Sequence, residues 1–132
     1  MSAATQMRTS PSDDDEMVST EDVRAFASAL PRAEEALVRD RVKFRVGRIV
    51  FVALSRDETM MGVGFPKEER DALVAAEPDK FQLPRPSDMR YHWIEVHLAA
   101  IDIDEMRELV LDAWRMCVPK KISALVSGPE DV

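Results

Sequence analysis

The sequence is poor in the residues that build disulfides and metal sites. Only one of its 132 residues is a cysteine, Cys117, so the chain cannot form an internal disulfide or a site with several cysteine ligands. A single cysteine fits a reducing compartment, and we expect a cytoplasmic protein. The two histidines, His92 and His97, are five residues apart and would point to opposite faces of a strand. We therefore expect neither a metal nor a cofactor.

Long apolar segments and catalytic signatures are also missing. No apolar run approaches the roughly 18 residues that span a bilayer, and the N-terminal residues lack a basic start and an apolar centre, so we expect neither secretion nor membrane insertion. The sequence contains no GxSxG, GxGxxG, GxxxxGK or HExxH motif. Cys117 lies on the apolar stripe that includes Trp114, which indicates a small core residue rather than a nucleophile. We expect no enzymatic activity.

What is present is typical of one soluble domain. Apolar residues make up 45% of the chain and charged residues 33%, as in globular proteins. Residues 1–18 are rich in Ser, Thr, Pro and Asp and predict a disordered acidic tail. We expect a single domain over residues 19–126 and a frayed C-terminus over 127–132.

Charge is unevenly distributed along the chain. The formal net charge is −7, but residues 1–22 hold one arginine and six acids, so they carry −5 and leave −2 for the rest. Residues 32–56 hold seven basic and three acidic groups, or +4. The body of the protein is therefore polarised, and the sum misdescribes it.

The stretch RDRVKFRVGR carries the strongest local pattern, with a basic residue at every second position. On a strand, period-two geometry would send Arg39, Arg41, Lys43 and Arg45 to one face over about 20 Å. Such a face can contact the phosphates of DNA, or it can be a solvated face or a sheet edge protected by charge. Aromatic residues that would stack on bases are missing from this face. With the nearby Arg48, these residues are the candidate nucleic-acid site.

The remaining pattern predicts an α+β fold. Ser19 and Asp102 are expected to cap helices, Pro66 to begin a third, and residues 36–65 to form three strands joined by short turns. YHWIEVHL predicts a strand with Ile94, Val96 and Leu98 on one face and Trp93, Glu95 and His97 on the other. A pair between Glu95 and His97 is possible on that strand. We attribute the Gly62–Phe65 segment to a tight join between strand and helix. The prediction is an antiparallel sheet with about three helices packed on one face.

The chain resembles the MmcQ/YjbR family of small bacterial proteins over residues 22 to about 122. The segments that carry the resemblance are KFRVGRIVFVALS, GFPKEERDALVAAEPDKFQLP, SDMRYHWIEVHL and EMRELVLDAWRMCVPKK. The resemblance implies a two-layer α+β fold similar in shape to secretion-chaperone-like domains, and a DNA-binding role. It implies no catalytic residues.

Two functions from different classes follow. The first is weak DNA binding without catalysis, through phosphate contacts of Arg39, Arg41, Lys43, Arg45 and Arg48. The alternative is a protein-interaction module that uses the open sheet face and the loop from Pro84 to Arg90. The acidic tail would repel DNA or fold back over the basic face.

Overall fold

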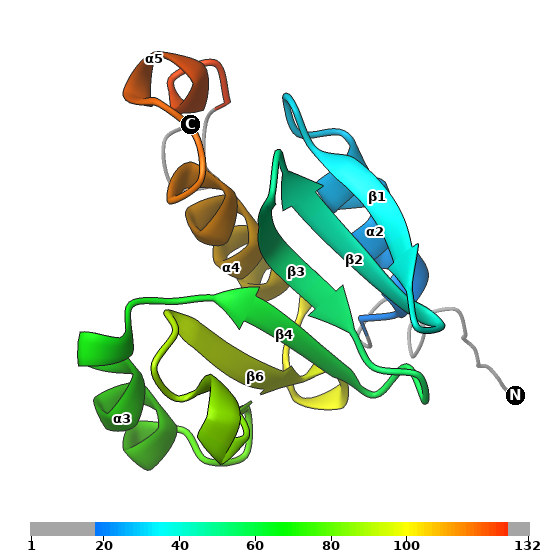
Figure 1. Cartoon of the computed structure of the whole chain (residues 1–132). Coiled ribbons are helices and arrows are strands. Elements are labelled where there is room, and N and C mark those ends of the chain that lie inside the picture. Colours follow the sequence, from blue (N-terminus) through cyan, green and yellow to red (C-terminus); the bar gives the residue numbers. More distant parts are fainter. Residues whose placement is uncertain (1–17, 127–132) are drawn as a thin grey trace, which may run out of the picture.

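A six-stranded antiparallel sheet forms one layer of the molecule and helices form the other (Figure 1). The computed structural model describes residues 18–126. The strands are β1 Glu34–Val38, β2 Arg41–Val46, β3 Ile49–Leu54, β4 Met60–Gly64, β5 Phe81–Gln82 and β6 Trp93–His97, in the order β1-β2-β3-β4-β6-β5. The first four strands follow one another as a meander, and β6 pairs with β4 before the two-residue β5 closes the edge.

The helices begin where the sequence supplies caps. In α2, Thr20–Ser28, Ser19 and Asp22 form a capping box, and in α4, Ile103–Arg115, Asp102 and Glu105 do the same. Both predicted caps are confirmed. The remaining α-helices in the described part of the chain are α3, Lys67–Ala76, and the short α5, Lys120–Ser123.

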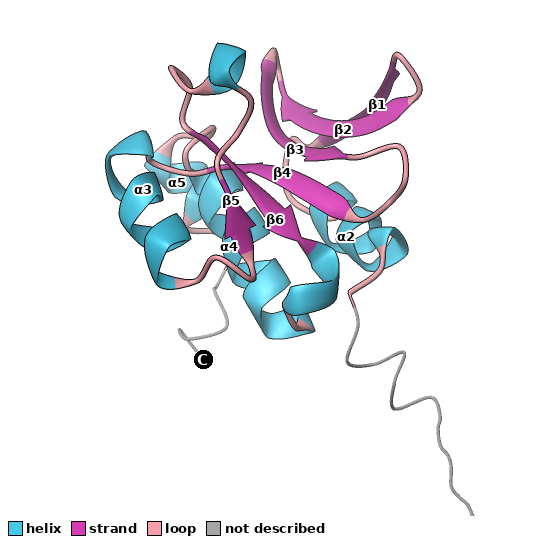
Figure 2. Ribbon diagram, turned by 90° about the horizontal axis from the view of Figure 1, so that it is seen from below, coloured by secondary structure: helices cyan, strands magenta, loops and turns pink. Residues whose placement is uncertain are grey.

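One face of the sheet carries the core. Alternation along the strands buries Phe44, Val63 and Ile94 completely, and α2 and α4 cover this face (Figure 2). Trp114 of α4 is also fully buried, and its indole N–H donates to the carbonyl of Pro31 at 2.8 Å. The two residues are 83 positions apart. The bond therefore ties α4 to the segment that follows α2. The predicted α+β architecture is confirmed.

The stretch from Arg39 to Arg48 is not one strand, which corrects the expectation that four basic side chains share a face. Val38 pairs with Arg41, so Arg39 and Asp40 form a two-residue turn between β1 and β2. Both turn residues have positive φ, 53° and 66°, as the type I′ hairpin turn requires. A bulge between Phe44 and Arg45 further shifts the register of β2 against β3. The basic alternation is therefore divided between a turn and a strand.

The helix α3 and the loop before β6 hold each other in place. His92 lies in that loop rather than on a strand, and its Nδ1 accepts a hydrogen bond of 3.0 Å from the backbone N–H of Lys67, the first residue of α3. This nitrogen satisfies one of the free amides at the start of the helix. Pro66, the residue before α3, offers no side-chain cap, so His92 supplies one from 25 residues away in the sequence.

The predicted acidic tail and frayed C-terminus lie outside the described residues, except for Val18. That side chain is 5% exposed and packs in the core directly before α2. Within residues 18–126, no helix is both long enough and apolar enough to cross a membrane.

Candidate functional site

The face of the sheet opposite α2 and α4 carries a row of side chains that crosses all six strands. Register pairs place the row on one face, and the two residues on its central strands are small. From β1 to β5 the row consists of Ala36, Lys43, Ala53, Gly62, Glu95 and Gln82. Lys43 and Glu95 are three strand spacings apart, about 14 Å between their backbones. Neither Ala53 nor Gly62 projects a large side chain of its own onto this face.

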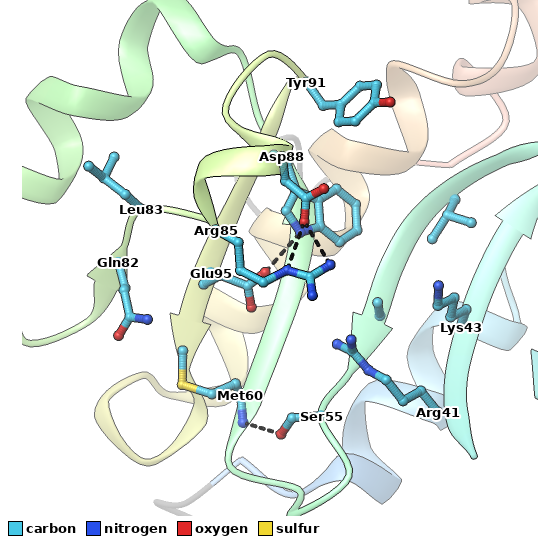
Figure 3. Close-up of a pocket in the computed structure, with 13 residues that line it drawn as sticks. Arg41, Lys43, Ser55, Met60, Gln82, Leu83, Arg85, Asp88, Tyr91 and Glu95 are labelled. Atoms are coloured by element: carbon cyan, nitrogen blue, oxygen red, sulfur yellow. Dashed lines mark hydrogen bonds and ion pairs between the residues drawn. The ribbon is translucent and has the colours of Figure 1, made fainter. Parts of the chain in front are cut away.

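Two adjoining hollows lie on this open face. The first, of about 520 Å³, extends from Arg41 and Lys43 to Glu95, and we call it the open-face pocket (Figure 3). The second, of about 600 Å³, lies beside the β1–β2 and β3–β4 turns. Both are lined by Arg41, Lys43, Ser55 and Arg85. The two hollows form one cleft, and its cations are Arg39, Arg41, Lys43, Arg56 and Arg85, which we call the basic cleft.

Two segments of the chain flank this cleft. Figure 2 shows the β1–β2 hairpin on one side and the loop between β5 and β6 on the other, both on the side of the sheet away from α2 and α4. The loop contains a turn of 3-10 helix, η2, Pro86–Asp88. It carries Arg85 and Tyr91, which line the open-face pocket.

A buried arginine holds this loop. Arg70 of α3 is only 4% exposed, and its guanidinium donates to the carbonyls of Met89, Tyr91 and Trp93 at 3.0–3.2 Å. Each buried carbonyl left without a donor would cost about 1–3 kcal/mol. Arg70 therefore fixes the backbone that places Tyr91 and Trp93 at the pocket, although it does not line the pocket itself.

Gly62 is small because Trp93 occupies the space above it. A Cβ at position 62 would lie 2.6 Å from Cζ2 and 2.7 Å from Nε1 of the Trp93 indole, closer than side-chain atoms approach. The indole N–H donates to Oε2 of Glu95 at 2.9 Å. The absence of a side chain at Gly62 thus makes room for the Trp93 indole. The tight strand-to-helix join expected from the sequence is not needed to explain this glycine.

Glu95 is a partly buried carboxylate among cations that do not pair with it. Burial raises its pKa, whereas the Trp93 hydrogen bond and the charge of Arg41 act in the opposite direction. Its hydrogen bond is to Trp93, not to His97 as the strand pattern allowed. A carboxylate offers about four lone-pair sites, so Glu95 keeps acceptors for a ligand.

The other two acids that line the cleft are engaged locally. Asp57 accepts from Ser55 Oγ at 2.7 Å and from Thr59 Oγ1 at 2.8 Å, and these bonds lower its pKa. Asp88 accepts from Arg85 at 3.4 Å across η2. Asp57 therefore shapes the β3–β4 turn and Asp88 the loop, and the cleft keeps an excess of positive charge.

The predicted site residues divide into two groups. Arg41, whose Nε donates to the carbonyl of Leu54 at 3.3 Å, and Lys43 both line the cleft, and Arg39 lies at its end in the turn. Arg45, at the other end of β2, forms an ion pair of 3.6 Å with Glu34. Arg48 is exposed in the β2–β3 turn and lines neither hollow. The structure thus brings three of the five together.

Sequence reasoning did not join the basic strand to residues from distant segments, although the alternative function named the Pro84–Arg90 loop that contains Arg85. Arg56 reaches the cleft from the β3–β4 turn, where its guanidinium donates to the carbonyl of Arg39 at 2.9 Å. Arg85, Tyr91 and Trp93 come from the loop before β6 and from β6 itself. The absence of aromatic residues held only for the basic strand, because β6 brings Trp93 and the loop before it brings Tyr91 to the same pocket.

Nothing in the described chain resembles a metal or thiol centre. Among residues 18–126, no three His, Cys, Asp or Glu side chains lie where they could hold a metal ion. The Cys117 thiol donates to the carbonyl of Ala113 at 3.5 Å, and burial raises its pKa. Cys117 packs against the core, as expected from its place on the apolar stripe.

Comparisons with known proteins place this fold. The crystal structure of protein DR2400 of Deinococcus radiodurans, which carries the DUF419 domain, is similar with a TM-score of 0.67. The two chains are 18% identical, and the match covers 88% of this chain and 93% of that one. No curated protein matches the sequence. The family model for YjbR matches residues 28–116, most of the described chain. The chain therefore belongs to the YjbR family.

Proposed function

We propose that this protein binds DNA weakly and with little sequence preference, through phosphate contacts in the basic cleft, and that it does so without catalysis. The observation that supports this is the convergence of Arg39, Arg41, Lys43, Arg56 and Arg85 on one open face. The proposal replaces a linear basic strand by a cleft, with Arg45 and Arg48 outside it.

The number of cations in the basic cleft sets the expected salt dependence of DNA binding. If all five cations neutralise phosphates, log K falls with log salt with a slope of at most about −4.5 on duplex DNA. Some of this attraction is offset by the net charge of −7. Binding is therefore expected at low ionic strength and should fade at physiological salt.

Charge reversal in the cleft tests the proposal. We would follow the fluorescence anisotropy of a labelled duplex at about 50 mM salt with the native chain and with Arg41→Glu plus Lys43→Glu. The double variant should lose at least about tenfold in affinity. The matched control is Lys120→Glu plus Lys121→Glu, which makes the same charge change on α5, in the helical layer. No binding by the native chain, or equal losses in both variants, would contradict the proposal.

A protein partner is the second candidate, and one observation favours it. Leu83 and Tyr91, at the two ends of the loop, are 39% and 51% exposed and line the open-face pocket. Apolar side chains beside cations are common at protein interfaces. The substitution Tyr91→Ala should lower the affinity for a protein partner that binds here. The affinity for a duplex bound through its phosphates should change little.

A further inference from the structure

The open-face pocket combines a partly buried carboxylate with several cations. Figure 3 shows Arg41 and Lys43 on one side and Glu95 and Gln82 on the other, with Arg85 and Asp88 beside Glu95. Within the described residues the side-chain donor to Glu95 is Trp93, and of the three cations that line the same hollow, Arg41 and Arg85 act on Glu95 through their charge. A ligand that fits this arrangement carries an anionic group and, some distance away, hydrogen-bond donors.

The size and walls of the pocket narrow the class of ligand. Its volume of about 520 Å³ lies in the range of about 300–1,000 Å³ of small-molecule sites. Trp93 and Tyr91 both line it, and aromatic rings are the usual neighbours of unstacked bases in proteins that bind single strands. Phosphate, base and donor groups occur together in a nucleotide.

The carboxylate selects among the bases. An ionised carboxylate only accepts hydrogen bonds. Guanine alone presents two adjacent donors, N1–H and the 2-amino group, on one edge, and Watson–Crick pairing hides that edge in a duplex. Adenine, cytosine and thymine each present one donor group beside acceptors. A base that meets Glu95 must therefore be unpaired, and guanine matches it best.

We propose that the open-face pocket binds one unpaired guanine nucleotide of a single-stranded nucleic acid. The guanine N1–H and 2-amino group donate to Glu95, and the phosphate on the same strand contacts Arg41 and Lys43. The base lies beside Trp93 and Tyr91. This inference rests on the proposed binding of DNA by the basic cleft and adds to it a preference for an unpaired strand and for one base.

The test compares labelled single-stranded oligonucleotides on the native, full-length chain. One is twelve thymidines long, the second has guanine at a central position, and the third has inosine there, which lacks the 2-amino group. We expect guanine to raise the affinity at least about fivefold over thymine, and inosine to lose most of that gain. Unlabelled dGMP in excess should compete for the guanine oligonucleotide, because the free nucleotide has the same chemistry.

A protein variant checks which residue reads the base. Glu95→Met keeps the length of the side chain and removes its acceptors, so it should bind all three oligonucleotides with the affinity of the thymidine strand. Glu108→Met, on the exposed surface of α4, is the control and should keep the guanine preference. The inosine comparison uses the native chain and does not depend on the variant folding.

The outcomes separate this inference from the proposed function. Equal affinity for the three oligonucleotides, with loss in Arg41→Glu plus Lys43→Glu, would overturn the guanine site and leave the basic cleft intact. Tighter binding to a duplex than to the guanine strand would do the same. No binding to any nucleic acid would overturn both. A dGMP affinity equal to that of the oligonucleotide would assign the pocket to a free nucleotide and overturn the single-strand part.

Discussion

At the scale of single residues, Glu95 is a carboxylate whose charge the fold disfavours. Burial raises its pKa, and the charged groups that act on it are Arg41, Asp88 and Arg85. A carboxylate that is costly to ionise is seldom kept for stability alone. The burial that raises the pKa of Glu95 should therefore also have a measurable effect on the free energy of unfolding.

Glu95→Gln should stabilise the protein at neutral pH. Because the folded pKa lies above the unfolded value of about 4.3, the folded chain holds the proton more tightly. Stability is then lost as the pH rises from the unfolded pKa through the folded one. The variant has no such loss. Urea unfolding at pH 7 and at pH 4 should show the larger gain at pH 7.

Glu108→Gln, an equal change of charge on exposed surface, should show no comparable gain. A native chain that gains stability relative to Glu95→Gln between pH 4 and pH 7 would contradict this account of Glu95.

Single residues also mark where sequence reasoning stops. The alternation of apolar residues put Ile94 and Val96 on one face of a strand, and the structure shows that this face is the buried one. The reason for Gly62 depends on an indole 31 positions away, and Arg70 on three carbonyls near β6. No local pattern contains these contacts, so the site could not be assembled from the sequence.

At the scale of elements, the β1–β2 hairpin is the point where the sequence pattern was misleading. Its turn residues, Arg39 and Asp40, have positive φ, a conformation usually marked by Asn-Gly or Asp-Gly. Because the turn lacks glycine, the sequence does not mark it as a turn. The apolar and basic residues around it therefore predicted one continuous strand. The capping boxes of α2 and α4, by contrast, involve residues three apart and were readable.

Replacing the turn residues should stabilise this hairpin. Arg39→Asn together with Asp40→Gly removes the strain of two left-handed residues and should raise the free energy of unfolding by about 1 kcal/mol. The measurement is the urea midpoint at constant m-value. Asp40→Val, a β-branched residue at the same positive φ, should lower the midpoint instead. A midpoint unchanged in both variants would mean that the turn adopts another conformation in solution.

At the scale of the whole molecule, the negative charge is concentrated towards the ends of the chain. The described residues 18–126 carry 17 basic and 19 acidic side chains, a net charge of −2, whereas residues 1–17 add −3. Thr20 Oγ1 donates to Glu58 at 3.2 Å, so the start of α2 lies beside the β3–β4 turn that carries Arg56. Four of the acids of the chain, Asp13 to Glu16, precede the described residues.

Neutralising those acids should strengthen DNA binding. Asp13→Asn, Asp14→Asn, Asp15→Asn and Glu16→Gln remove four negative charges from the full chain. We expect affinity for a duplex to rise several-fold at about 50 mM salt and the gain to disappear near 1 M, where screening acts within about 3 Å. A gain that persists at high salt would indicate a contact other than charge, and a loss of affinity would reverse the role of the tail.

The positions of the two tryptophans give the protein an optical signal of its own. Trp114 is fully buried and bonded to Pro31, so its emission reports on folding and stays constant while the fold persists. Trp93 lines the open-face pocket with its indole N–H on Glu95, where an arriving base would quench it. The sequence contains no third tryptophan. Ligand occupancy and unfolding can therefore be followed in one unlabelled sample, each from a separate fluorophore.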